Sequence, residues 1–166
     1  KSSIFIITNE SINIENKNFY CDNIDLKSIP EELNKFDNVT IFARLSKKKR
    51  SKKINLENIN ISRNIFTFLF KIFKSFKQNN NKYFIISLSP YTFLASILLK
   101  VFSKKHFIYL RSDGYKEYRS ILGFIGPAVY HVMFSISSLI SNLISCQKFI
   151  LRNKKGNILS PSQLDE

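Results

Sequence analysis

Short, continuous runs of apolar residues recur along the chain and are separated by polar stretches. The strongest runs are rich in β-branched and aromatic residues, which is typical of strands buried on both faces of a sheet. These runs are residues 3–8, 39–43, 83–88 and 106–110. Residues 54–61 alternate apolar with polar positions and predict an exposed edge strand, and short runs at 143–146 and 157–160 predict two late strands.

Helical spacing and helix-start residues fill the intervals between these runs. Residues 28–36 hold Pro30 where a first helical turn would be, followed by glutamates that complement the positive end of the helix dipole. Residues 62–78 place apolar side chains every three or four positions after Ser62, the predicted N-cap. The remaining predicted helices are 89–102 and 115–140, the second interrupted near Gly126 and Pro127.

Strands that alternate with helices indicate a parallel sheet. We therefore predict an α/β fold with a Rossmann-like, mostly parallel sheet and helices on both of its faces. Ligands of such sheets bind beyond the carboxyl ends of the strands, so the polar residues that follow the predicted strands are candidate binding residues. They are Asn9, Glu10, Arg44, Ser89, Tyr91, Arg111, Ser112, Asp113 and Gly114.

The charge of the chain adds a class of partner to this picture. Lys and Arg total 26 against 12 Asp and Glu, which gives a formal net charge of +14. Such an excess predicts a partner that carries negative charge: phosphate, nucleic acid or anionic lipid. The chain is also rich in Ile, Asn, Lys and Phe, whose codons are A/T-rich, so codon bias is an alternative source of part of the lysine excess.

The densest positive charge lies at residues 44–53, where seven of ten residues are cationic and none is acidic. The segment follows a predicted strand, so we expect a loop that docks on anionic phospholipid, with about 1 kcal/mol from each basic residue near the surface. A nucleic-acid or nuclear-import patch and a merely solvated loop are the alternatives. The predicted docking residues are Lys47, Lys48, Lys49, Arg50, Lys52 and Lys53.

Two helical segments have compositions that suit a membrane as well as a protein core. Residues 62–78 set phenylalanines beside lysines, as interfacial basic helices do, although a core helix with a solvated lysine face is the simpler interpretation. Residues 121–145 contain no charged side chain and exceed the length that spans a bilayer. Their serines and His131 would be costly inside a membrane, so we favour a buried or interfacial helix over a transmembrane one.

The string from Arg111 to Gly114 is the best candidate for chemistry because it ends a strong strand. Asp113 could accept a proton from a hydroxyl or orient it, and Arg111 could pair with a phosphate. The alternative is a turn in which Asp113 caps the helix that follows.

Several other kinds of site find no support in the sequence. The two histidines, His106 and His131, and the two cysteines, Cys21 and Cys146, have no metal-ligand spacing, so we expect no metal and a reducing cytosol. The glycine patterns of dinucleotide sites, P-loops and nucleophile elbows are missing as well, and we expect no cofactor.

The order of the elements and four stretches resemble the N-terminal, acceptor-side half of GT-B glycosyltransferases, most closely the family 4 type that builds bacterial surface polysaccharides. The stretches are FIISLSPYTFLASILLKVF, HFIYLRSDGYKEYR, ISNLISCQKFIL and GNILSPSQLDE. The resemblance implies a Rossmann-like acceptor-side domain over residues 1–160, with 161–166 leading into a C-terminal domain that binds the donor. It also implies that Asp113 occupies the catalytic-loop position.

What the resemblance implies for activity is transfer of a sugar from a nucleotide-sugar to a lipid-linked or surface-polysaccharide glycan acceptor. The enzyme would be cytoplasmic and peripheral, on the inner face of the cytoplasmic membrane, and this part of it alone would be inactive. Nucleic acid is not an expected partner. The alternative is a basic module without catalysis that binds nucleic acid or a membrane surface.

Overall fold

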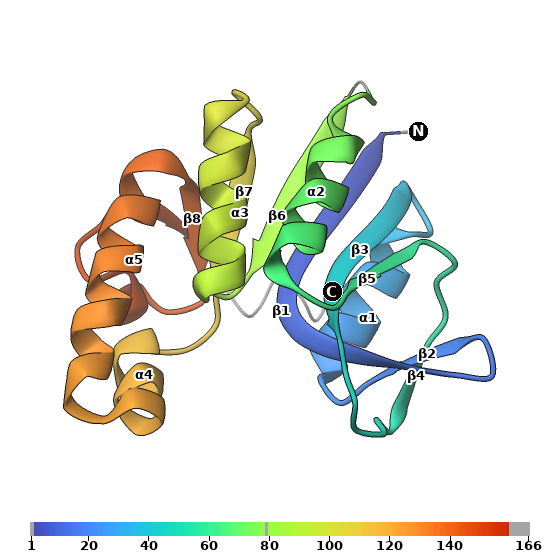
Figure 1. Ribbon diagram of the computed structural model, residues 1–166. Coiled ribbons are helices and arrows are strands. Elements are labelled where there is room, and N and C mark those ends of the chain that lie inside the picture. The colour runs from blue at the N-terminus through green and yellow to red at the C-terminus, as the bar shows by residue number, and fades with distance from the viewer. Residues whose placement is uncertain (1, 79, 160–166) are drawn as a thin grey trace. The chain divides into compact units, whose positions relative to one another are not determined.

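A computed structural model describes residues 2–78 and 80–159 (Figure 1). The fold is α/β with a mostly parallel sheet, which confirms the fold class predicted from the alternation of strands and helices. The backbone packs into two compact units, one that extends to Phe84 and one that begins at Ile85. The expectation of a single domain over 1–160 stays a prediction, and the predicted linker at 161–166 lies outside the described residues.

The first unit is built around β1, whose neighbours are β2, β3 and β6. Its strands are β1 (Ser3–Glu15), β2 (Asn18–Cys21), β3 (Asn38–Leu45), β4 (Lys52–Ile54), β5 (Ile59–Ser62) and β6 (Asn81–Ile86), the last divided by the unit boundary. β1, β3 and β5 run parallel, whereas β1–β2 and β2–β4 are antiparallel. Phe5, Phe42 and Tyr83 stack at the centre of this unit, with ring centroids 5.2 to 5.7 Å apart.

β1 is longer than the predicted strand because it continues past an irregularity in its pairing with β3, between Ile7 and Ser11. The second part of β1 turns back into β2 at Asn16 and Lys17, which both have positive φ, as the two central residues of a tight hairpin require. Asn9 and Glu10, which were predicted to follow the first strand, therefore lie within β1, at its irregularity.

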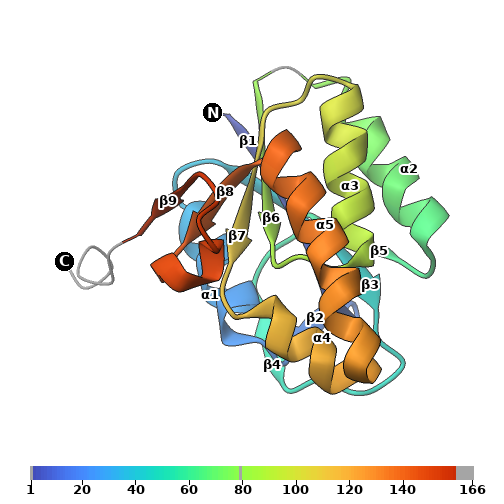
Figure 2. The same ribbon diagram turned by 90° about the vertical axis from the view of Figure 1, so that its left-hand side faces the viewer.

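Two helices lie on opposite faces of the sheet in the first unit (Figures 1 and 2). α1 (Ile24–Leu33) begins earlier than predicted because the side chain of Asn23 accepts a hydrogen bond from the Asp25 amide at 2.9 Å, and Pro30 lies inside the helix. α2 (Ile65–Ser75) is capped by Asn64, whereas Ser62 ends β5. Asn64 therefore has the capping role that the sequence assigned to Ser62, and Asn23 caps a helix that starts before the predicted residue 28.

The second unit contains the parallel strands β7 (His106–Leu110), β8 (Asn142–Ser145) and β9 (Gly156–Ile158). Its helices are α3 (Pro90–Val101), α4 (Gly114–Leu122) and α5 (Gly126–Ile140), with the short 3-10 turns η1 (Gly123–Ile125) and η2 (Lys148–Leu151). α3 and α5 cover one face of β7 and β8, and η2 lies on the other (Figure 2). Ser89 and Thr92 form a capping box at the start of α3, where the sequence predicts a helix start.

The predicted interruption of the long helix near Gly126 is confirmed, and the packing gives its cause. A Cβ atom on Gly126 would lie 1.9 Å from the carbonyl oxygen of Tyr118, so only glycine lets α5 return this closely against α4. The two helices then pack through aromatic rings, with Tyr115 of α4 in edge contact with both Tyr130 and Phe134 of α5.

Candidate functional site

Three of the predicted binding residues lie in the first unit, near the irregular part of β1. Arg44 donates a hydrogen bond from Nη1 to Oδ1 of Asn9 at 3.3 Å, so the structure brings these two predicted residues together. Glu10 accepts a bond from Nδ2 of Asn23, the cap of α1, at 3.2 Å. Each of the three polar side chains therefore has a partner within its own unit.

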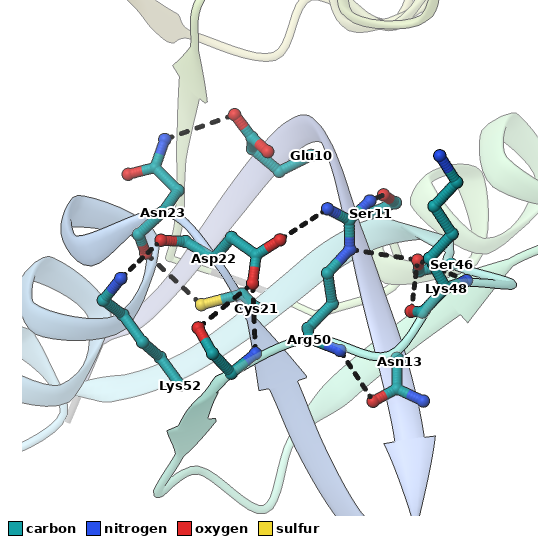
Figure 3. Close-up of polar contacts among 11 residues, drawn as sticks. Glu10, Ser11, Asn13, Cys21, Asp22, Asn23, Ser46, Lys48, Arg50 and Lys52 are labelled. Carbon is teal, nitrogen blue, oxygen red and sulfur yellow. Dashed lines mark hydrogen bonds and ion pairs between the residues drawn. The ribbon is translucent and has the colours of Figure 1, made fainter.

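The basic segment is organised by Arg50, whose contacts are drawn in Figure 3. The guanidinium donates to Oδ2 of Asp22 at 2.6 Å, to Oγ of Ser11 at 2.7 Å and to Oγ of Ser46 at 3.0 Å. The second oxygen of Asp22 accepts from the Ser51 amide at 3.0 Å. The hydrogen bond from Arg50 is the largest cause of the lowered pKa of the Asp22 carboxyl. The segment is thus fastened to β1 and to the end of β2.

The predicted docking residues separate into two groups by their contacts. Arg50 and Lys52 face inward, since Lys52 donates from Nζ to the carbonyl of Asp22 at 2.9 Å. The exposed members are Lys47, Lys48, Lys49 and Lys53, of which Lys49 pairs with half-buried Glu15 at 3.1 Å. A docking role for all six residues stays a prediction, and Arg50 and Lys52 also have a structural role that the sequence did not reveal.

Asp113 follows β7 in the second unit, and both of its carboxylate oxygens have partners. Oδ1 accepts from the Tyr115 amide at 3.1 Å, which makes Asp113 the N-cap of α4, and Oδ2 pairs with Nη2 of Arg152 at 3.1 Å. The Asp113 side chain is 9% exposed, and Arg152 also lies over the Tyr115 ring, 4.7 Å from its centroid. The capping alternative is therefore correct, and a catalytic role for Asp113 stays a proposal.

The other predicted residues of this unit surround little empty space. Ser112 donates to a carboxylate oxygen of Glu117, and Ser89 accepts from the Thr92 amide at 3.3 Å in the capping box. A Cβ atom on Gly114 would lie 2.0 Å from the Tyr130 ring, so glycine is required there for packing. The hollow beside Ser112, whose lining also includes Arg111 and Gly114, measures about 10 Å³, which is room for one water at most.

Arg44 belongs to the first unit, and Tyr91 and Asp113 belong to the second. The candidate binding residues are therefore divided between the two units, and a binding role for Arg44 and Tyr91 stays a prediction.

A larger cleft lies elsewhere in the second unit, and sequence reasoning missed it. It has a volume of about 650 Å³ and is lined by Asp113, Lys116, Lys148, Phe149, Arg152 and Asn153. The lining residues come from the start of α4 and from η2 and the turn that follows it. The signal in the sequence was the second cluster of basic residues near Lys148, which is weaker than the cluster at 44–53.

The second unit also exposes a broad apolar surface on α4, η1 and α5. Phe124 is 91% exposed, Leu139 83%, Ile121 72% and Val132 56%. Among the described residues, the helical stretch Gly114–Ile140 is the one long and apolar enough to cross a membrane by length and composition, with 27 residues. The opposite side of α5 is buried, through Tyr130, Met133, Phe134 and Ser137. α5 is thus apolar on both sides but covered on only one.

The two histidines have different surroundings. His106 is buried in β7, with Nε2 2.6 Å from Oγ of Ser141 and Nδ1 3.0 Å from the carbonyl of Lys104. Burial lowers the pKa of its imidazole, so the neutral form is favoured. His131 is exposed on α5 and bonds to the Tyr115 hydroxyl at 2.8 Å. Over the described part of the chain, no group of three or more His, Cys, Asp or Glu side chains could hold a metal ion.

Comparison with known proteins adds no further constraint. No protein-family model, no curated protein and no solved structure matches this chain.

Proposed function

We propose that this chain is the acceptor-side domain of a glycosyltransferase that works on the surface of an anionic membrane. The glycosyltransferase part is supported by the resemblance of the sequence and by the α/β fold with a mostly parallel sheet. It is also supported by the position of Asp113, in the short connection between the carboxyl end of β7 and α4. The donor is a nucleotide-sugar bound by a further domain, and the acceptor is a lipid-linked or polysaccharide glycan.

The uncovered apolar face of α5 is the observation that carries the membrane part of this proposal. Val129, Val132, Ile136 and Leu139 follow one another at helical spacing, with exposed fractions of 38%, 56%, 39% and 83%. Soluble proteins seldom leave a contiguous apolar surface of this kind without a partner. The neighbouring 3-10 turn adds Phe124 and Ile125 to the same apolar stretch of chain.

The charges near this face favour lipid as the partner. Lys116 and Arg119 are exposed on α4, and α5 contains no acidic residue that would repel anionic headgroups. The first unit repeats this combination, because α2 exposes Phe66 and Phe70, and Lys74 lies over the Phe70 ring at 4.6 Å. An apolar helix face flanked by cations binds a leaflet through buried area and through attraction to anionic lipid.

The test of the membrane proposal is flotation of the chain with vesicles of phosphatidylcholine, with and without phosphatidylglycerol. A double variant, Val132→Ser with Leu139→Ser, removes two exposed apolar side chains from α5. Full burial of such a side chain contributes about 1.5–3 kcal/mol, so partial insertion of both predicts a loss of binding of about 30-fold or more. The matched control is Leu94→Ser with Val101→Ser on α3, where the side chains are 40% and 71% exposed.

Equal binding by the α5 variant and the α3 control would remove the membrane part of the proposal. Binding that is unaffected by salt or by the anionic lipid would remove the role of the lysines. The enzymatic part is tested by sugar transfer in the complete protein, where Asp113→Asn should abolish activity if Asp113 orients or deprotonates the acceptor hydroxyl. Retention of transfer by that variant would end the proposed role.

A further inference from the structure

The cleft of about 650 Å³ in the second unit gathers positive charge from two separate elements. Lys116 comes from the first turn of α4, and Lys148 and Arg152 come from η2 and the residue that ends it. The one carboxylate in the lining belongs to Asp113, whose charge is already matched by Arg152 at 3.1 Å. The two lysines therefore leave the cleft with an excess of positive charge.

The availability of Lys116 and Lys148 differs from that of Arg50, the residue that organises the basic segment of the first unit. Lys116 and Lys148 have exposed side chains, and neither forms an ion pair with an acidic residue in the described part of the chain. In the basic segment, by contrast, Arg50 has three side-chain partners within the fold. The lysines of the cleft can therefore contact an external anion without breaking an internal contact.

Arg152 is held in a fixed position at the edge of the cleft. One of its nitrogens bonds to Asp113, its guanidinium lies 4.7 Å from the centre of the Tyr115 ring, and its side chain is 49% exposed. Positioning of this kind reduces the side-chain entropy lost when a ligand binds. The planar guanidinium also matches the geometry of phosphate oxygens better than a lysine does.

The backbone behind the cleft turns at two consecutive residues. Arg152, which ends η2, and Asn153 have positive φ, of 47° and 65°. Left-handed residues are common where a helix ends, and both of these residues line the cleft. A second hollow of about 340 Å³ shares Lys148 and Asn153 with the first and adds Lys154 and Lys155. The cationic surface therefore extends along the whole turn.

We propose that this cleft binds a phosphate-bearing ligand, a phosphomonoester or a diphosphate, through Lys116, Lys148 and Arg152. Phe149, 58% exposed in the same lining, offers an apolar face to the group that carries the phosphate. The phosphate belongs either to a soluble molecule or to a lipid headgroup. The inference uses only residues of the second unit and does not depend on the glycosyltransferase assignment.

The test is isothermal titration of the chain with inorganic pyrophosphate at low salt. The expected result is saturable binding that weakens as salt is raised. The double variant Lys116→Ala with Lys148→Ala should bind about tenfold more weakly or worse, since each lysine contributes a charge-assisted contact. The matched control, Lys100→Ala with Lys105→Ala, removes the same charge from exposed positions outside the cleft and should change the affinity by less than about twofold.

Two further arms identify the source of the phosphate. Vesicles of phosphatidylcholine with phosphatidic acid test a headgroup, and the same vesicles without phosphatidic acid show the binding that comes from the α5 face alone. A loss in the cleft variant with either pyrophosphate or phosphatidic acid supports the site. The site would be overturned if the cleft variant and the control bound both probes with equal affinity. It would also be overturned if the cleft variant lost affinity for single-stranded RNA but for neither pyrophosphate nor phosphatidic acid.

Discussion

Substitution of Asp113 tests how much its helix cap and its ion pair each contribute to the stability of the second unit. Its Oδ1 caps α4 through the Tyr115 amide at 3.1 Å, and its Oδ2 pairs with Arg152. Asp113→Asn retains an oxygen that can accept the capping bond but loses the charge, whereas Asp113→Ala loses both. Comparison of the two variants therefore separates the cap from the ion pair.

The expected magnitudes follow from these contacts. Loss of an N-cap costs about 1 kcal/mol. The ion pair contributes about 0.5–1 kcal/mol, because Arg152 is 49% exposed and solvent screens the interaction. The free energy of unfolding should therefore fall by about 0.5–1 kcal/mol in Asp113→Asn and by about 1.5–2 kcal/mol in Asp113→Ala.

Urea unfolding followed by far-ultraviolet circular dichroism measures these differences, and hydrogen exchange of the α4 amides localises them to the second unit. Arg152→Gln, alone and combined with Asp113→Asn, completes a cycle whose coupling energy should equal the ion-pair contribution. Equal stabilities of Asp113→Asn and Asp113→Ala would refute the capping argument. A stable Asp113→Asn variant would also ensure that loss of sugar transfer in the complete protein reports on chemistry.

Three further predictions concern side chains that are buried or hydrogen-bonded within the fold. Because burial lowers the pKa of His106, the unfolded chain protonates it first, so Tm should fall as the pH drops from about 7 to 5, and His106→Gln should reduce this dependence. Tyr83→Phe removes a buried hydroxyl that lies 2.8 Å from Oγ of Ser75 and should lower the free energy of unfolding by about 1–2 kcal/mol in urea titrations. Arg50→Ala releases the segment after β3, so limited trypsin digestion followed by mass spectrometry should show faster cleavage at 47–49.

Each of these three predictions has a comparison that could contradict it. An unchanged pH dependence in His106→Gln would show that other groups cause the acid destabilisation. Tyr20→Phe changes a half-buried tyrosine and should cost less than about 0.5 kcal/mol, so an equal loss there would contradict the argument for Tyr83. Lys53→Ala, which removes an exposed cation from β4, should leave the rate of trypsin cleavage at 47–49 unchanged.

The elements that could be predicted from the sequence are those whose signal is local. The strand at 106–110 and the helix start at Ser89 were predicted where they occur, because continuous apolar residues and a Ser-Pro start determine them without distant contacts. The break at Gly126 was likewise visible in the Gly-Pro pair. The hairpin at Asn16 was missed because β2 has only four residues and pairs only with Asn13–Glu15 at the end of β1, so the alternation of apolar and polar residues is brief.

The candidate sites depended on contacts between residues far apart in the sequence. The basic segment was predicted from composition, but only the structure pairs Arg50 with Asp22, 28 positions earlier. Asp113 was correctly placed at the end of a strand, and its bond to Arg152, 39 positions later, was not foreseeable. The cleft beside Asp113 arises in the same way, because its lining joins Lys116 of α4 to Lys148 and Arg152, which lie far from it in the sequence.

The sequence by itself determined the α/β class, the order of the main strands and the excess of positive charge, since these depend on local periodicity and on composition. Tertiary structure decided which cations are used inside the fold and which face outward, and which side of α5 is covered. The physical reason is that the spacing of apolar residues predicts helices and strands from neighbours in the sequence alone. Partners for a charge or an apolar face are chosen by packing between segments that the sequence does not place beside each other.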